Sequence, residues 1–182
     1  MLIQLDNNEV IILKTIFLIR HSLKERKYYS SNESIDKQKF DEKKRLSDEG
    51  KELAYKLSQL DILKNVKEVW VSNYERAIET AKYINNDRIN ITDSFDERHY
   101  GDFEENANKE EFWVSQFKDE NLKNINGESH KEVRKRFDDK INYILANSSN
   151  NEIAKDGIMK SPSMMKLVFD NNTLIDIEYI EI

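Results

Sequence analysis

Arginine and histidine side chains follow a strongly apolar stretch near the start of the chain. TIFLI (15–19) runs directly into Arg20 and His21. A guanidinium binds phosphate or carboxylate oxygens through paired N–H groups, and an imidazole exchanges protons or acts as a nucleophile near neutral pH. The pair either caps a strand for structural reasons or is presented to a ligand.

Chemically active side chains also follow the next two apolar stretches. Ser72 follows VKEVWV (66–71), Arg76 lies four residues later, and Glu97 comes after RINITDS (88–94). If these stretches are parallel strands of one sheet, their carboxyl ends meet at one edge, where α/β folds bind ligands. The sequence therefore predicts two guanidiniums, an imidazole and a carboxylic acid at that edge.

Strand and helix patterns alternate through the first half of the chain. TIFLIR (15–20), VKEVWVS (66–72) and RINITDS (88–94) are typical of strands, the first of them buried on both faces. LSDEGKELAYKLSQLDI (46–62) predicts a helix that Ser47 caps, and NYERAIETAKYI (73–84) predicts a second. Their inward-facing residues are expected to be Leu53, Leu57 and Leu60 in the first helix and Ala77, Ile78, Ala81 and Ile84 in the second.

The rest of the chain predicts two loops, two helices and a hairpin. Residues 24–45 and 95–105 are expected to be loops, residues 107–118 and 128–147 helices, and the C-terminal stretch a hairpin that turns at Asp170, Asn171 and Asn172. We therefore predict one α/β domain over residues 1–182. It is a three-layer sandwich whose mainly parallel central sheet is flanked by helices, with a C-terminal β-hairpin.

Composition excludes several classes of protein. The chain has 182 residues, 38% hydrophobic and 35% charged, with a net charge of −6 and no cysteine. This is too apolar for a disordered chain, argues against a nucleic-acid-binding face, and leaves no disulfide or thiolate metal site. The most hydrophobic window, VIILKTIFLI (10–19), is too short for a spanning helix. We expect a soluble cytoplasmic protein with no membrane partner.

Five motifs in order carry a resemblance to a known family. They are LIRHS (18–22), LSDEG (46–50), VWVSNYERAIETA (69–81), FDERHYGDFEE (95–105) and NGESHKEVRKRF (126–137). Together they resemble the histidine phosphatase superfamily, the phosphoglycerate-mutase-like proteins, over about residues 14–147. Each motif alone is weak, and their order and spacing carry the resemblance. DERHYG (96–101) is more similar to the cofactor-dependent mutases than to the phosphatases.

The resemblance implies a role for each matching residue. His21 would be the nucleophile that forms a phosphohistidine, and Arg20 and Arg76 would hold the phosphoryl oxygens. Glu97 would protonate the leaving oxygen and then activate water. Ser22 stands where the family has glycine, and its side chain would narrow the pocket or add a hydroxyl contact to the substrate.

Further implied contacts come from Arg98, Tyr100 and Glu128, which would touch the substrate or support the site. The resemblance requires no metal and no cofactor. The implied partner is a small phosphorylated substrate or a phosphoprotein. The sequence does not indicate an oligomeric state.

One part of the family pattern is missing. The family carries a second histidine, in a His-Gly pair at the end of a buried strand after the long helix. NEIA (151–154) begins such a strand, but the strand end, the His-Gly pair and the following helix are absent. Either the protein lacks this segment, and the site has one phosphate donor fewer, or the printed sequence omits residues that the protein has.

Three functions remain open at this stage, besides a purely structural explanation of each residue. The first is a phosphomonoester phosphatase, which the short chain favours over a mutase. The second is a catalytically weak or inactive module that binds a phosphate ligand or a protein. The third, more distant, is a metal-dependent hydrolase using the acidic cluster between Asp96 and Asp102.

Overall fold

A mixed β-sheet forms the centre of the fold. The structure is a computed structural model that describes residues 2–4, 10–26, 37–85, 87–102, 108–147, 152–154 and 161–180. In spatial order the sheet contains β4 (Ile89–Ile91), β3 (Glu68–Val71), β5 (Glu152–Ala154), β2 (Val10–Arg20), β6 (Ser163–Asp170) and β7 (Thr173–Ile180). A short β1 (Leu2–Gln4) pairs antiparallel with β2.

The two halves of the sheet differ in strand direction. Pairing is parallel from β4 through β3 and β5 to β2, and antiparallel from β2 to β6 and from β6 to β7. The α/β class predicted from the sequence is confirmed. The sheet itself is a mixture, because the predicted C-terminal hairpin, β6 and β7, joins the sheet edge to edge with β2. The hairpin turns at Asn171 and Asn172, and Asn171 has a φ of 53°.

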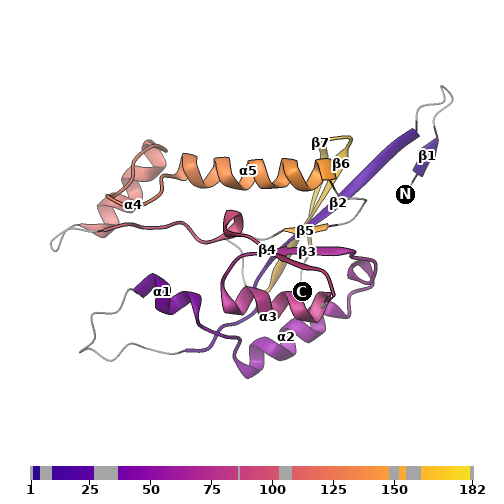
Figure 1. Cartoon of the computed structure of the whole chain (residues 1–182), viewed down its shortest axis with the longest axis horizontal. Coiled ribbons are helices and arrows are strands. Elements are labelled where there is room, and N and C mark those ends of the chain that lie inside the picture. Colours follow the sequence, from indigo (N-terminus) through magenta and orange to yellow (C-terminus); the bar gives the residue numbers. More distant parts are fainter. Residues whose placement is uncertain are drawn as a thin grey trace.

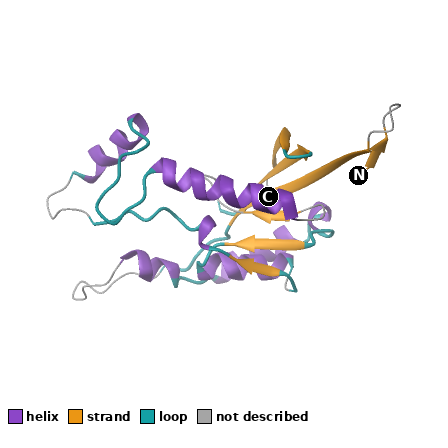
Figure 2. Cartoon of the chain, turned by 45° about the horizontal axis from the view of Figure 1, so that its top comes forward, coloured by secondary structure: helices purple, strands orange, loops and turns teal. Residues whose placement is uncertain are grey.

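Strand β2 separates two hydrophobic cores. Phe17 and Ile19 pack with α2 (Asp48–Ser58) and α3 (Glu75–Ile84), whereas Ile16 and Leu18 pack with α5 (His130–Asn147). This alternation is the period of a strand buried on both faces. Figure 1 shows α5 on one side of the sheet and α2 with α3 on the other, and Figure 2 shows the strands between these helices.

Local sequence signals explain the first of these helices. Ser47 caps α2 as predicted, because its hydroxyl accepts a hydrogen bond from the Gly50 N–H at 3.0 Å. Leu57 is fully buried in the core, while Leu53 is only partly buried and Ala54 takes its place inside. In α3, the predicted inward residues all contact the core: Ala77, Ile78, Ala81 and Ile84.

The predicted loop over residues 24–45 contains a short helix that the sequence did not reveal, α1 (Lys37–Glu42). A bridge between Lys24 and Leu46 closes the base of this segment. The helices predicted over residues 107–118 and 128–147 are present as α4 (Lys109–Lys118) and α5, and two short 3-10 helices, η1 (Asp61–Leu63) and η2 (Asp93–Phe95), were not predicted. Within the described ranges, no helix is long and apolar enough to cross a bilayer.

Three predictions concern segments outside the described residues. They are the middle of the 24–45 loop (27–36), the end of the 95–105 loop (103–105), and the junction after β5 where the His-Gly segment is missing (155–160). Strand β5 itself lies in the sheet, parallel to β2 on one side and to β3 on the other.

Candidate active site

His21 follows β2 directly, and its two ring nitrogens have different partners. Nδ1 lies 2.6 Å from the carbonyl oxygen of Ser22, and Nε2 lies 2.9 Å from Nε of Arg76. A carbonyl only accepts, so Nδ1 carries a proton, and a guanidinium only donates, so Nε2 presents a lone pair. The contacts therefore assign a neutral imidazole with a nucleophilic Nε2, the state expected for attack on phosphorus.

Arg76, in the first turn of α3, is the centre of the polar contacts at this edge of the sheet. Its side chain is 1% exposed. Besides His21, its guanidinium contacts Glu97 Oε1 at 2.6 Å, Asp41 Oδ2 at 3.1 Å and the Asp41 carbonyl at 2.7 Å. It also stacks on the Tyr74 ring, 4.4 Å from the ring centroid. A guanidinium is a suitable donor for an oxyanion, but here two carboxylates and an imidazole occupy it, so an oxyanion has to displace one of them.

The segment that carries Glu97 is tied to the start of α3. Asp96 accepts hydrogen bonds from the Asn73 backbone N–H at 2.8 Å and from the Asn73 side chain at 3.0 Å. These bonds hold residue 97 beside the first turn of α3, which carries Arg76. The ion pair between Glu97 and Arg76 follows from this local arrangement.

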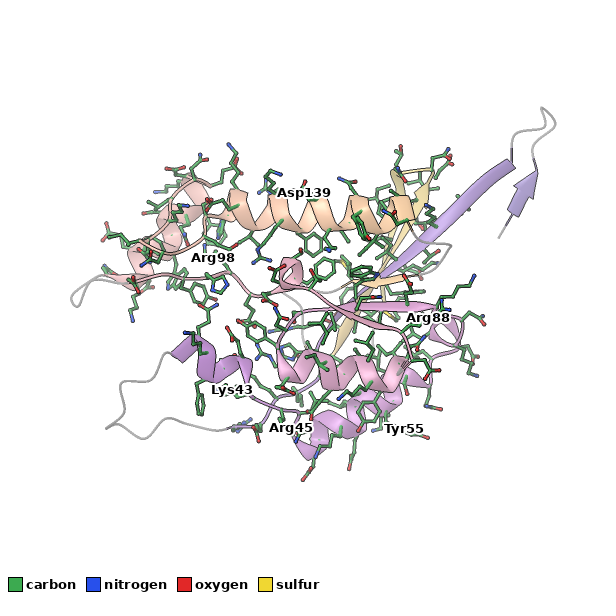
Figure 3. The ribbon with its side chains drawn as sticks, viewed as in Figure 1. Lys43, Arg45, Tyr55, Arg88, Arg98 and Asp139 are labelled. Atoms are coloured by element: carbon green, nitrogen blue, oxygen red, sulfur yellow. The ribbon has the colours of Figure 1, made fainter. Side chains whose placement is uncertain are left out.

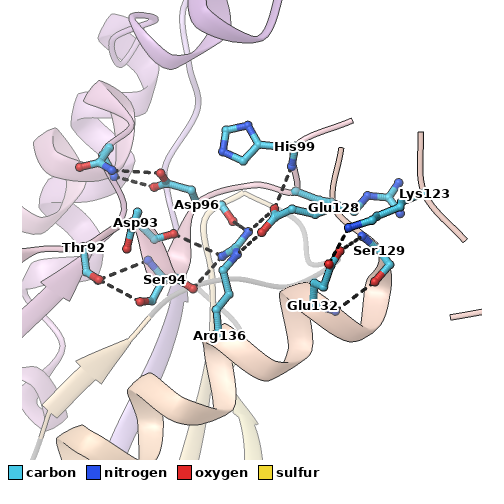
Figure 4. Close-up of polar contacts among 12 residues, drawn as sticks. Thr92, Asp93, Ser94, Asp96, His99, Lys123, Glu128, Ser129, Glu132 and Arg136 are labelled. Atoms are coloured by element: carbon cyan, nitrogen blue, oxygen red, sulfur yellow. Dashed lines mark hydrogen bonds and ion pairs between the residues drawn. The ribbon is translucent and has the colours of Figure 1, made fainter. Parts of the chain in front are cut away.

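Arg136 of α5 holds the same segment from the other side (Figure 4). Its guanidinium donates to the carbonyls of Ser94 at 2.8 Å and Asp96 at 2.9 Å, and to both carboxylate oxygens of Glu128 at 2.8 and 3.0 Å. Burial raises the pKa of Glu128, but hydrogen bonds from Arg136 and the His99 N–H hold it below its ordinary value. Glu128 therefore supports the site's frame, one of the two roles that the resemblance allowed for it.

Two glycines bring the DERHYG and NGES motifs together. Gly101 has a φ of +69°, and a Cβ on it would lie 2.4 Å from the Ile125 carbonyl oxygen. A Cβ on Gly127 would lie 2.9 Å from the Tyr100 carbonyl oxygen. No other residue type fits this crossing without a shift of the backbone. The glycines thus fix how the Glu97 segment meets α5.

A cavity of about 700 Å³ lies between the Glu97 segment and α5. Four predicted site residues line it, Arg20, Glu97, Arg98 and Tyr100, together with His130 and Arg134. Arg98 donates to Gln116 Oε1 at 2.6 Å and stacks near Tyr100 and Trp113, and burial lowers the pKa of its guanidinium. Figure 3 shows Arg98 on the chain that leads from η2 toward α4, in the space between α1 and α4.

The predicted residues thus fall into three groups. His21, Arg76 and Glu97 form one chain of contacts. Glu97 also lines the cavity with Arg20, so it links the two sets. Ser22 belongs to neither: its side chain is fully buried, and its hydroxyl donates to the Gly50 carbonyl at 2.6 Å. The substrate contact expected of Ser22 is therefore replaced by a structural bond to α2.

Sequence reasoning missed two functional neighbours, Asp41 and Arg136. Asp41 lies on the unexpected helix α1, where its carboxylate contacts Lys24, Lys44 and Arg76. Arg136 lies within the NGESHKEVRKRF motif that was recognised, but nothing in the sequence distinguishes it from its basic neighbours. The contact of Asp41 with Arg76 joins residues 35 positions apart, and that of Arg136 with Asp96 joins residues 40 positions apart, so no local signal in the sequence indicates them.

The acidic cluster considered for a metal has other partners. Asp96 binds Asn73, and Asp102 accepts from Asn126 at 2.7 Å. Among the described residues, no three His, Asp or Glu side chains gather as metal ligands. These carboxylates join backbone segments rather than converging on a point.

Comparison with solved structures shows the same fold in several proteins, some of them described as phosphatases. A mycobacterial glucosyl-3-phosphoglycerate phosphatase is 14% identical, with a TM-score of 0.64 over 92% of this chain and 97% of that one. A putative alpha-ribazole-5'-P phosphatase from Escherichia coli is 16% identical, with a TM-score of 0.64 over 92% and 95%. Bacillus stearothermophilus YhfR is 16% identical, with a TM-score of 0.62 over 89% and 94%.

Sequence comparison points in the same direction. No curated protein matches the sequence at a significant level. The family description "Histidine phosphatase superfamily (branch 1)", however, matches residues 16–155, which is most of the chain. The match includes the predicted nucleophile, both predicted phosphate-binding arginines and the predicted acid. The chain belongs to the histidine phosphatase superfamily.

Proposed function

We propose that the protein is a phosphomonoester hydrolase that works through a phosphohistidine on His21. The observation that carries this proposal is the contact between Arg76 and the lone pair of His21 Nε2, because it joins a phosphate-binding group to a neutral nucleophile. Arg20 and Arg76 hold the phosphoryl oxygens, and Arg98 and Tyr100 contact the rest of the substrate from the cavity wall.

The reaction has two steps. His21 Nε2 attacks phosphorus and the bond to the ester oxygen breaks. Glu97, which takes up a proton from solvent when the phosphoryl group replaces it on Arg76, gives that proton to the ester oxygen. The Ser22 carbonyl accepts from Nδ1–H and stabilises the charge that develops on the ring. Glu97, now a carboxylate, takes a proton from water as the water attacks phosphorus and the bond between phosphorus and His21 Nε2 breaks. Inorganic phosphate leaves, and the neutral imidazole is restored.

Substrate, partner and location are the finer parts of this proposal. We expect a small phosphorylated molecule or a phosphoprotein as the substrate, and we place the activity in the cytoplasm on the sequence grounds given above. One solved relative, the mycobacterial glucosyl-3-phosphoglycerate phosphatase, is described in complexes with inorganic phosphate and with VO3. Both anions are therefore suitable probes for this chain.

The test compares hydrolysis of an aryl phosphate between pH 5 and 8 by the wild type and by His21→Ala. We expect turnover by the wild type and a loss of activity in His21→Ala to the background rate. His99→Ala, a change of another histidine whose side chain is exposed, is the matched control and should keep activity. Equal inertness of wild type and His21→Ala would overturn the hydrolase.

An inactive phosphate-binding module is the second candidate. Two observations favour it: the second histidine of the family is not in the sequence, and Asp41 already contacts the guanidinium of Arg76. If phosphate and vanadate bind to the protein but no phosphate ester is hydrolysed, this candidate replaces the first.

A further inference from the structure

Three cations converge on the carboxylate of Asp41. Lys24 Nζ lies 2.7 Å from both carboxylate oxygens, Lys44 Nζ lies 3.0 Å from Oδ1, and Arg76 Nη2 lies 3.1 Å from Oδ2. Burial raises the pKa of Asp41, but hydrogen bonds from the two lysines and the charge of Arg76 hold it below its ordinary value. The carboxylate is thus an ionised oxyanion inside a cluster of positive groups.

The cluster lies beside the proposed nucleophile. The guanidinium that contacts Asp41 through Nη2 contacts His21 Nε2 through Nε. Asp41 supplies one negative charge to all three cations, and Glu97 supplies a second to Arg76 alone. A phosphoryl group supplies close to two charges and three acceptor oxygens, so it matches the cluster better.

Two of the three cations, Arg76 and Lys24, differ from Asp41 in how they are anchored, whereas Lys44 follows α1 by two residues. Arg76 belongs to α3, and Lys24 lies in the bridge with Leu46 that closes the base of the 24–45 segment. That base is also held by hydrogen bonds from the Ser47 N–H to the Leu23 carbonyl at 3.0 Å and from the Glu25 N–H to the Arg45 carbonyl at 2.9 Å. Arg76 and Lys24 are therefore part of the scaffold.

Asp41, in contrast, belongs to α1, which polar contacts hold in place. Gln38 donates to the Arg98 carbonyl at 3.1 Å and to the Tyr74 hydroxyl at 3.4 Å. Both hydrophobic cores, as far as the structure describes them, are built without α1. A segment that contributes no residue to these cores opens more easily than one that is packed into them. Figure 1 shows α1 beyond one end of α3, on the side of the sheet away from α5.

We propose that Lys24, Lys44 and Arg76 form the binding site for the phosphoryl group of the substrate, and that Asp41 occupies this site in the free protein as an internal competitor. The inference deepens the proposed function and rests on it. It adds two lysines to the phosphate-binding residues, and it requires α1 to withdraw before substrate binds.

Binding of inorganic phosphate and of orthovanadate, measured by titration calorimetry, tests the competition. Asp41→Asn removes the competing charge, so we expect its Kd for both anions to fall about tenfold. Asp61→Asn is the matched control, because Asp61 forms an exposed ion pair with Lys64 and, within the described part of the chain, makes no contact with the cluster. An unchanged Kd in Asp41→Asn, or an equal fall in Asp61→Asn, would overturn the proposal.

The role of the lysines is tested in the Asp41→Asn background, where they no longer hold a charged side chain. Adding Lys44→Ala should raise the Kd for phosphate about tenfold, and Lys24→Ala should act similarly. The matched control in the same background is Lys64→Ala, which should change nothing. If Lys44→Ala binds phosphate as tightly as the Asp41→Asn parent, the lysines are not part of the site.

A second variant covers the case in which Asp41→Asn does not fold. Gln38→Ala loosens α1 and leaves all the charges of the cluster in place, so it too should lower the Kd. A folded Gln38→Ala with unchanged phosphate affinity would then overturn the inference.

Turnover separates this inference from the proposed function. If His21→Ala abolishes hydrolysis but Asp41→Asn leaves the phosphate Kd unchanged, only the inference fails. If the binding results come out as expected and no variant hydrolyses a phosphate ester, the hydrolase fails and the anion site stands.

Discussion

Arg76 connects the groups that the proposed reaction uses. Its guanidinium contacts the lone pair of His21, the carboxylate of Glu97 and the carboxylate of Asp41. A phosphoryl group that arrives at His21 Nε2 must take over part of these donors. The free protein therefore holds the arginine that we propose binds phosphate in a charged network that substrate would have to rearrange.

Glu97→Gln tests whether this carboxyl is the acid that protonates the leaving group. The amide cannot transfer a proton, so we expect hydrolysis of an alkyl phosphate to fall by about 10² to 10⁴. An aryl phosphate with an acidic phenol releases that phenol as an anion that needs no proton, so its rate of hydrolysis should fall far less. The two kcat/KM values, measured for wild type and variant, give the comparison.

The control for this prediction is Glu75→Gln, which removes the same charge from an exposed residue in the first turn of α3. It should leave kcat/KM for both substrates unchanged. Equal losses on the alkyl and aryl phosphates in Glu97→Gln would show that Glu97 acts on binding alone.

At the scale of residues, the sequence predicts what motifs encode and misses what long-range contacts create. His21, Arg76 and Glu97 were found because each stands in a recognisable motif, and the structure places them in contact. Asp41 was missed because its carboxylate becomes part of the site only through its contacts with Lys24 and Arg76, which are distant in the sequence. A substrate contact was predicted for Ser22 because nothing in the local sequence indicates that its hydroxyl donates a hydrogen bond to the Gly50 carbonyl.

The elements around the site depend on one close approach between α2 and the chain after β2. A Cβ on Gly50 would lie 2.0 Å from the Leu23 carbonyl oxygen. In the same region, the Ser22 hydroxyl donates a hydrogen bond to the Gly50 carbonyl, and the Ser47 N–H donates one to the Leu23 carbonyl. The glycine of the LSDEG motif is therefore what lets α2 brace the residues that follow His21.

Gly50→Ala should disturb both stability and activity. The added methyl forces either α2 or the backbone at Leu23 to move, and we expect a loss of about 1–3 kcal/mol in the free energy of unfolding. Because Ser22 moves with this contact, the position of His21 changes and kcat falls as well. Urea denaturation and aryl phosphate hydrolysis measure the two effects.

Glu49→Ala serves as the neighbouring control, since Glu49 is exposed in the same turn of α2. A Gly50→Ala protein with wild-type stability would contradict the close approach. Wild-type kcat in a destabilised Gly50→Ala protein would contradict the link to His21.

Long periodic elements were predictable, and short ones were not. Helices α2, α3 and α5 show the apolar period of packed helices, and Ser47 marks the start of α2. Helix α1 has six residues, KQKFDE, with no apolar face, and it is held by contacts of Gln38 and Asp41 with distant residues. The mixed sheet was less evident because strand patterns predict a hairpin but not which strand it joins.

The whole molecule carries several carboxylates whose pKa values folding lowers. They include Asp41 beside its cations, Glu128 beside Arg136, and Glu132, whose pKa falls to about 2 through hydrogen bonds from Lys123 and Ser129. At a pH near or below its ordinary pKa, such a group binds protons more readily in the unfolded chain than in the folded protein. Its stabilising effect is complete above the unfolded value and is lost as the pH falls through the folded value.

Acid should therefore destabilise the fold over a defined range. From the ordinary value of 4.5 for Glu128 down to about 2 for Glu132, we expect the free energy of unfolding to fall continuously. A smaller fall should begin near pH 6.5, because burial and nearby arginines lower the pKa of His130 in the fold. Urea denaturation at a series of pH values measures this dependence.

Arg136→Met tests how much of the acid dependence comes from the clamp on the Glu97 segment. Without the guanidinium, Glu128 stays partly buried and loses the main group that lowers its pKa, so the variant should lose about 2 kcal/mol at pH 7. At pH 3 the loss should be smaller, because Glu128 is then largely protonated in the variant and the wild type no longer gains the full ion pair. Arg134→Met is the matched control on the same helix, since Arg134 forms an exposed pair with Glu120 and should show little change at either pH. If the Arg136→Met and wild-type curves run parallel from pH 7 to pH 3, the clamp acts through its bonds to the Ser94 and Asp96 carbonyls and not through its charge.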